Sequence, residues 1–102
     1  MQIQNLDIPE QQIEEYCRQK RIRKMMLFGS VVRNDFRPES DVDVLVEFEP
    51  EARVGLIRFA GMELELTDLL KRKVDLNTID FIHPEYRDEI LREARLIYDQ
   101  AQ

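Results

Sequence analysis

Residues 41–48 read Asp-Val-Asp-Val-Leu-Val-Glu-Phe, and this stretch decides how the rest of the chain is interpreted. Its hydrophobic residues recur at every second position, which is typical of a β-strand with one face in a hydrophobic core. The three valines and Phe48 then share the core face, whereas Asp41 and Asp43 leave the opposite face together. Their Cα atoms lie roughly 6.5 to 7 Å apart on such a strand, so the two carboxylates are able to share a hard cation such as Mg²⁺. An isolated Asp-x-Asp pair is more often solvated or part of a turn, so the neighbouring sequence has to decide.

A second motif stands upstream, where residues 25–30 read Met-Met-Leu-Phe-Gly-Ser. The apolar run predicts a short buried strand that enters a turn at Gly29 and Ser30, followed by a short helix. Backbone N–H groups and a hydroxyl at such a turn point toward an anion, as in a phosphate-binding loop. The alternative is a plain strand-to-helix turn in which Ser30 caps the helix, and the acidic pair downstream favours phosphate binding.

A third acidic residue, Asp75, lies in the next predicted strand between Val74 and Leu76. The two apolar side chains are expected to point to the core and the carboxylate away from it. If this strand pairs beside residues 41–48, three carboxylates converge, which suits a site for two metal ions. The residues alone leave a second interpretation open, in which Asp75 is an exposed acid at the end of a strand.

The spacing of these motifs resembles a known family. Gly-Ser at 29–30, ten intervening residues and Asp-x-Asp at 41–43 are similar to the signature of the nucleotidyltransferase superfamily with a DNA-polymerase-beta-like palm. The small size, Arg33 and residues 74–76 further resemble its minimal nucleotidyltransferases, the MntA-type antitoxins that pair with HEPN-domain toxins. The resemblance covers nearly the whole chain. It implies an α/β (α+β) fold with a small mixed β-sheet flanked by helices.

The resemblance also implies roles for individual residues. Gly29 and Ser30 contact the triphosphate of the nucleotide, with ATP as the expected substrate. Asp41, Asp43 and Asp75 are the expected catalytic residues and Mg²⁺ ligands, in a site for two ions. All five residues are present in this chain.

Arg33 belongs to the same expected nucleotide-binding set, and two interpretations of it stay open. It reaches a phosphate of the nucleotide, or it forms an exposed ion pair with Asp35 or Glu39. The loop departs from the family pattern at the next position, where Asn34 replaces a frequent glycine. Because Asn tolerates the left-handed conformation better than most residues, we expect a glycine-like turn to survive there.

Taken together, the resemblance implies a protein adenylyltransferase antitoxin. It would move AMP from Mg-ATP to a hydroxyl, expected to be that of a tyrosine, on a cognate HEPN toxin. One alternative is an antitoxin that binds and masks its partner without catalysis. Another is nucleotidyl transfer to a small molecule, for which a chain of 102 residues leaves little material to build an acceptor pocket.

Composition sets limits on these functions. A length of 102 residues fits a single domain over residues 1–102. The formal net charge of −6 argues against direct binding of long nucleic acid. No apolar stretch approaches the roughly 20 residues of a membrane span, and the N-terminus lacks a signal-peptide pattern. A cytoplasmic protein without membrane contact is therefore expected. Cys17 is the single cysteine, which excludes a disulfide framework and favours a small buried side chain.

Three longer helices are predicted around the strands. The first starts with Asp7 as its cap and Glu10 completing a capping box. The second spans residues 55–71, and the last carries its apolar stripe over residues 84–98. His83 is expected in a cap or loop role at the start of the last helix and not in catalysis. The predicted order is helix, strand, short helix, strand, helix, strand, helix.

Overall fold

A central four-stranded sheet organises the fold in the computed structural model, which describes residues 1–33 and 35–101. The strands lie in the order β5, β4, β3, β6. β3 pairs antiparallel with both β4 and β6, whereas β4 and β5 are parallel. The four strands span Ile22–Phe28 (β3), Val42–Phe48 (β4), Val74–Thr78 (β5) and Arg95–Asp99 (β6).

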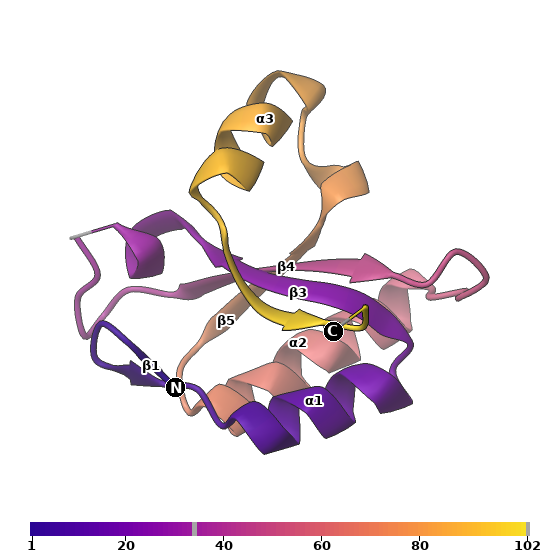
Figure 1. Ribbon diagram of the computed structural model, residues 1–102, viewed down its shortest axis with the longest axis horizontal. Helices are drawn as coiled ribbons and strands as arrows, with labels where there is room; N and C mark the ends of the chain where they lie inside the picture. The colour runs from indigo at the N-terminus through magenta and orange to yellow at the C-terminus, as the bar shows by residue number, and fades with distance from the viewer. Residues whose placement is uncertain (34, 102) are drawn as a thin grey trace.

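Helices lie on both sides of this sheet (Figure 1). α1 and α2 run below it, and α3 stands above it. α2 forms the crossover between the parallel strands β4 and β5, since parallel neighbours cannot be joined by a tight turn. This mixed sheet with flanking helices confirms the predicted fold class. The helices span Glu10–Gln19 (α1), Leu56–Leu70 (α2) and Pro84–Glu93 (α3).

The alternation predicted for β4 is confirmed for the valine face, although Leu45 on the opposite face is also fully buried and Phe48 is only partly buried. Val42, Val44 and Val46 are fully buried, whereas Asp43 is only partly buried. The strand begins at Val42, one residue later than expected, so Asp41 stands at the end of the preceding loop. The valine face anchors β4 in the core and leaves the acidic face on the side of α3.

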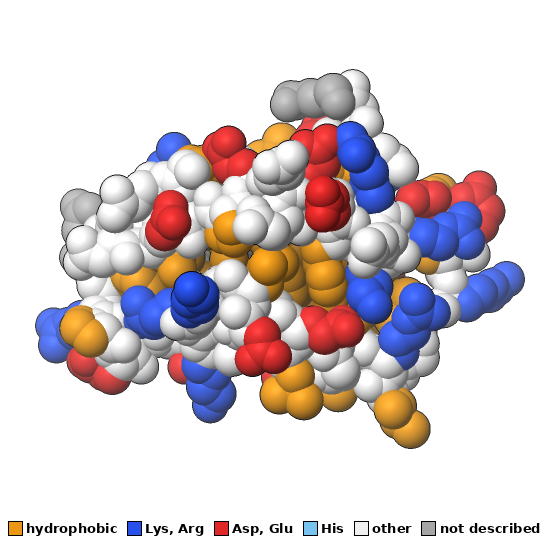
Figure 2. Space-filling view, turned by 90° about the horizontal axis from the view of Figure 1, so that it is seen from below, with side chains coloured by type: hydrophobic (Ala, Val, Ile, Leu, Met, Phe, Trp, Pro, Cys, Tyr) orange, Lys and Arg blue, Asp and Glu red, His pale blue; other side chains and the backbone are white. Residues whose placement is uncertain are grey.

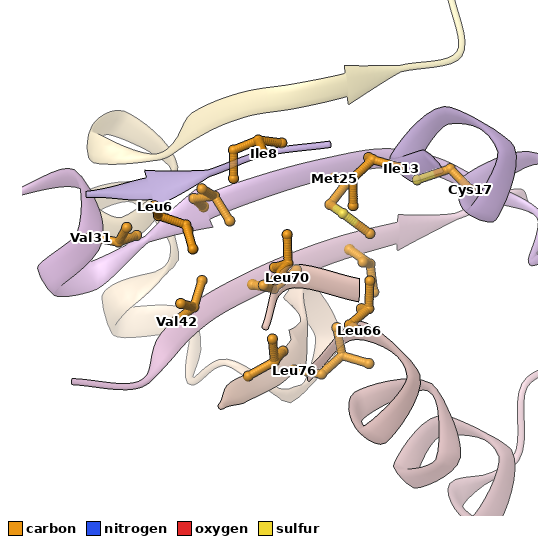
Figure 3. Packing of buried hydrophobic residues seen from close by; sticks show 14 of the residues in the cluster. Leu6, Ile8, Ile13, Cys17, Met25, Val31, Val42, Leu66, Leu70 and Leu76 are labelled. Atoms are coloured by element: carbon orange, nitrogen blue, oxygen red, sulfur yellow. The ribbon is translucent and has the colours of Figure 1, made fainter. Parts of the chain in front are cut away.

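The two helices below the sheet send apolar side chains into one core (Figure 3). α2 contributes Met62, Leu66 and Leu70, which recur at every fourth position and therefore share one helix face. α1 contributes Ile13 and Cys17. Cys17 is fully buried, as the sequence predicted.

The N-terminal segment differs from the prediction. Asp7 does not cap a helix but lies in β2 (Leu6–Asp7), which forms a small hairpin with β1 (Gln2–Ile3). α1 begins at Glu10 without a side-chain cap. The hairpin is favoured because it buries Ile3 and Leu6 almost completely in the core, a tertiary contribution that the capping pattern does not include.

The C-terminal segment also differs, because the last helix is shorter than predicted. It ends at Glu93, and Ala94 already has an extended backbone with ψ 144°. The following residues form β6, which pairs with the free edge of β3 through Leu27 and Arg95 among others. The hydrogen bonds offered by that edge outweigh a helical pattern that reached residue 98.

The remaining predicted elements are confirmed. α2 matches the second helix, and the strand expected around residues 74–76 is β5. Gly29 opens a short 3-10 helix, η1 (Gly29–Val32), and a second one, η2 (Ile79–Phe81), precedes α3. His83 caps α3, where its Nδ1 accepts a hydrogen bond from the backbone N–H of Glu85. The turn expected at Asn34 lies outside the described residues.

Figure 2 views the molecule from below, where acidic and basic side chains are mixed across the surface. Apolar side chains also reach the surface on α2, where Leu56, Ile57 and Leu64 are 75%, 92% and 70% exposed. None of the helices in the described part of the chain combines the length and the hydrophobicity of a membrane span.

The two faces of α2 predict different responses to truncation. Leu66→Ala removes atoms from a fully buried side chain and should lower the free energy of unfolding by about 2–5 kcal/mol. Leu64→Ala, two residues away on the exposed face, is the matched control and should change it by less than about 0.5 kcal/mol. Urea unfolding measures both values. Equal losses would contradict the assignment of the two faces.

Candidate active site

Two acidic residues face each other across the parallel strand pair. Asp43 of β4 is the register partner of Asp75 of β5. On β5 the flanking Val74 and Leu76 are buried, whereas Asp75 is exposed. Because side chains alternate along a strand, Asp43 and Asp75 leave the same face of the sheet. The condition set by the sequence, that this strand should pair beside residues 41–48, is therefore met.

The carboxylates influence one another electrostatically. Partial burial of Asp43, the charge of Asp75 and a hydrogen bond with it, and the charge of Asp41 together raise the pKa of Asp43 from 3.8 to about 6. Arg33 acts in the opposite direction. Like charges held this close disfavour ionisation, so the site face carries negative charge that a cation would neutralise.

Gly29 lies directly against this cluster. Its neighbour Phe28 is the register partner of Asp43 on the other side of β4. Gly29 itself has a φ of +72°, a conformation that L side chains rarely adopt. A Cβ atom at this position would overlap the Asp43 carboxylate. Both the backbone conformation and the space therefore require glycine here.

Ser30 follows Gly29 within η1, and Arg33 is the first residue after η1. The backbone N–H of Arg33 donates to the Ser30 carbonyl oxygen at 3.1 Å, which ends the short helix. The Arg33 guanidinium lies 3.7 Å from Asp35 and 4.0 Å from Glu93 of α3. Of the two ion pairs weighed from the sequence, the described residues show the one with Asp35, and Glu93 is an additional partner that the sequence did not indicate.

A cavity of about 300 Å³ opens beside this cluster, between the sheet and α3. Tyr86 and Ile90 fall within the apolar stripe predicted over residues 84–98, which the sequence did not connect to the site. No motif marks them, because their position depends on where α3 packs above the sheet. The cavity is lined from the sheet side by Phe28, Gly29, Arg33 and Asp43, and from α3 by Tyr86, Glu89, Ile90 and Glu93.

The donor set is suited to a metal that is shared with a substrate. Within residues 1–33 and 35–101, no three acidic, histidine or cysteine side chains are gathered into a complete metal site. Mg²⁺ usually binds through one or two carboxylates and takes its remaining oxygens from water and phosphates. Asp43 and Asp75 in register, with Asp41 close enough to affect the pKa of Asp43, supply oxygen donors of this kind. The residues therefore fit Mg²⁺ in an open site.

Comparison with known proteins gives matches over most of the chain. Residues 10–97 match the family model described as nucleotidyltransferase domain. A Methanocaldococcus jannaschii protein named as a candidate protein adenylyltransferase is 39% identical over 74 residues, which cover 72% of this chain and 76% of the relative. The protein adenylyltransferase MntA of Thermococcus cleftensis is 36% identical over 73 residues, which cover 72% of each chain.

Solved structures share the fold. A toxin–antitoxin structure with AMP-PNP has a TM-score of 0.74 at 18% identity and covers 90% of this chain and 74% of that chain. A structure of the tri-AMPylated Shewanella oneidensis HEPN toxin in complex with MNT antitoxin has a TM-score of 0.65 at 18% identity, covering 91% and 71% of the two chains. At this level of identity the comparison establishes the arrangement of elements.

The close approach of Gly29 to Asp43 predicts that alanine changes protein stability in opposite directions at Gly29 and at Gly61. Gly29→Ala should destabilise the protein by about 1–3 kcal/mol, because it adds both a left-handed non-glycine residue and a steric overlap. Gly61→Ala is the matched control in α2, where a Cβ meets nothing within 4 Å, and should stabilise by about 0.5–1 kcal/mol. Thermal unfolding of both variants measures the difference, and an unchanged stability of Gly29→Ala would contradict the packing described.

The repulsion around Asp43 predicts that a neutral side chain stabilises the metal-free protein. A carboxyl with a raised pKa binds its proton more tightly in the folded state, so its stabilising contribution is lost as the pH rises from about 4 to about 6. Asp43→Asn should therefore raise the free energy of unfolding at pH 7.5 by about 1 kcal/mol after solvent screening, or roughly 4–8 °C in the unfolding midpoint.

The same variant has a second readout. Mg²⁺ should raise the unfolding midpoint of the unmodified protein and leave that of Asp43→Asn nearly unchanged, because a bound ion stabilises only the state that binds it. Calorimetric scans with and without Mg²⁺ measure this. A variant less stable than the parent without metal would show that the carboxylates are not in repulsive contact.

Proposed function

Because the chain belongs to the nucleotidyltransferase domain family, we propose that it transfers AMP from ATP to a hydroxyl of a HEPN toxin and so neutralises that toxin. The observation that carries this proposal is the register of Asp43 and Asp75 beside Gly29. It brings an acidic pair and a glycine turn to the same end of the sheet.

The proposed acceptor is supported by the relatives. The Thermococcus protein is a protein adenylyltransferase, and the Shewanella structure contains an AMPylated HEPN toxin together with its MNT antitoxin. Their chains align with most of this one. A HEPN toxin is therefore the proposed partner here, and a tyrosine hydroxyl the proposed acceptor. The AMP-PNP in a further toxin–antitoxin structure supports ATP as the nucleotide.

The proposed reaction is an in-line displacement. The acceptor oxygen attacks the α-phosphorus of ATP, the bond from that phosphorus to the bridging oxygen breaks, and pyrophosphate leaves. In this proposal Asp75 accepts the proton of the hydroxyl, which is supported by its exposed position in register with Asp43. Mg²⁺, held by Asp41, Asp43 and Asp75, would neutralise the charge of the triphosphate and the leaving pyrophosphate.

The triphosphate is assigned to the turn that follows β3. Gly29 adds no side chain of its own between the backbone of this turn and the Asp43 carboxylate beside it, and Ser30 offers a hydroxyl donor. Arg33, three residues after Ser30, carries a positive charge and pairs with Asp35 and Glu93. A bound phosphate would compete for that guanidinium, because exposed ion pairs of this kind are weak.

The proposal predicts that the acidic pair is required for transfer. Asp41→Asn/Asp43→Asn should reduce transfer of labelled AMP to the HEPN partner more than about 10²-fold, since loss of groups that merely support metal ligands already costs 10–100-fold. The assay combines radiolabelled ATP, Mg²⁺ and partner, and follows label on the partner by gel and by intact mass.

A matched control separates chemistry from charge. Asp68→Asn removes an acid from the exposed surface of α2 and should leave transfer unchanged. Two results would contradict the proposal. One is the absence of label on the partner with the unmodified protein. The other is full neutralisation of the toxin by the Asp41→Asn/Asp43→Asn variant, which would favour an antitoxin that masks its partner without catalysis.

A further inference from the structure

Arg72 holds the loop that leads into the acidic pair. It follows α2 after one residue, the cap Lys71, which has a left-handed conformation with φ 58°. Its Nη2 donates to three backbone carbonyl oxygens of the loop between η1 and β4. These belong to Arg37 at 3.0 Å, Pro38 at 3.0 Å and Ser40 at 2.8 Å.

The guanidinium also stacks on an aromatic ring of the same loop. The carbon at its centre lies 4.5 Å from the centroid of Phe36, within the range of a cation–π contact. Phe36 in turn packs against the hydrophobic core. The Phe36 ring, which packs on the core, thus supports the guanidinium of Arg72 while its Nη2 donates to the carbonyl oxygens.

The parallel register explains why these segments meet. Val42 of β4 pairs with Val74 of β5, so the residues just before each strand are also neighbours. Ser40 and Arg72 stand two residues before those partners. The backbone N–H of Val42 donates to the Lys73 carbonyl oxygen at 2.8 Å, which joins the beginnings of β4 and β5 directly.

Asp41 lies between two fixed points. Ser40, before it, is bound by Arg72, and it also closes a local turn by accepting a hydrogen bond from the Arg37 backbone N–H at its Oγ at 3.1 Å. Val42, after it, is the first residue of β4. Asp41 itself is exposed and outside the strand, so its placement depends on the loop.

We propose that Arg72 is a positioning residue for Asp41, holding its carboxylate where it can bind the metal together with Asp43. This inference rests on the proposed function, because it assumes that Asp41 is a metal ligand. A functional carboxylate has to be held within about 0.5 Å of its working position. One nitrogen, Nη2, binds all three carbonyl oxygens while the planar guanidinium lies over the Phe36 ring, and a lysine lacks that planar group.

The test measures loop order and metal affinity separately. Hydrogen exchange follows the backbone amides of Arg37 and of residues 39–41, and Mn²⁺ binding is measured by electron paramagnetic resonance with the metal alone. Arg72→Ala should speed exchange in this loop and weaken Mn²⁺ binding about 10- to 100-fold, the usual effect of removing a residue that orients a metal ligand. At saturating metal, the rate of AMP transfer should recover toward that of the unmodified protein.

Two further variants serve as controls. Lys73→Ala removes one positive charge from an exposed side chain next to Arg72 and should leave Mn²⁺ affinity and loop exchange unchanged. Arg72→Lys keeps the charge but not the planar group that lies over Phe36, so it should bind Mn²⁺ more weakly than the unmodified protein. If Arg72→Ala does not fold, the comparison of Arg72→Lys with Lys73→Ala decides the question.

The outcomes distinguish this inference from the proposed function. Faster loop exchange together with weaker Mn²⁺ binding supports a positioning role. Faster exchange with unchanged affinity shows that Arg72 only stabilises the loop and overturns the inference, as does an unchanged exchange rate. If the unmodified protein binds no Mn²⁺ and transfers no AMP, the proposed function fails first and the inference falls with it.

Discussion

Two carboxylates face each other across a pair of parallel strands, and the sheet has to hold them there against their mutual repulsion. The restraint comes from the opposite face of β4, where Val42, Val44 and Val46 are fully buried in the core. Moving Asp43 away from Asp75 would pull these valines out of their packing, which costs more than the repulsion between partly solvated charges. The core thus holds the carboxylates of Asp43 and Asp75 close together, and a bound cation would neutralise their negative charge.

Much of the site could be predicted because it follows from local patterns. The alternation along residues 41–48 indicated both the buried face and the acidic face, and a glycine before a short helix indicated a turn. The register that places Asp43 opposite Asp75 could not be derived from the residues alone, because pairing between strands depends on the crossover through α2. The resemblance to minimal nucleotidyltransferases supplied that information.

The errors lie at the ends of the chain, where tertiary contacts outweigh local preference. Asp7 matched a helix cap, yet burial of Ile3 and Leu6 favours a hairpin. The apolar spacing predicted a helix to residue 98. Pairing of these residues with the open edge of β3 is more favourable, because it provides partners for the hydrogen-bonding groups of that edge. Arg72 carried no recognisable pattern at all, since its three acceptors are backbone carbonyl oxygens more than thirty residues away.

The parallel pairing of β4 and β5 also determines where such a domain can change in length. One residue added within β4 ahead of Asp43 would turn that side chain toward the valine core, because the two faces of a strand alternate. Residues added between β4 and α2, at positions 49–55, would leave both strands in register and lengthen only a surface loop. Insertions there could therefore create new contacts for a different partner protein, while the residues assigned to chemistry kept their places.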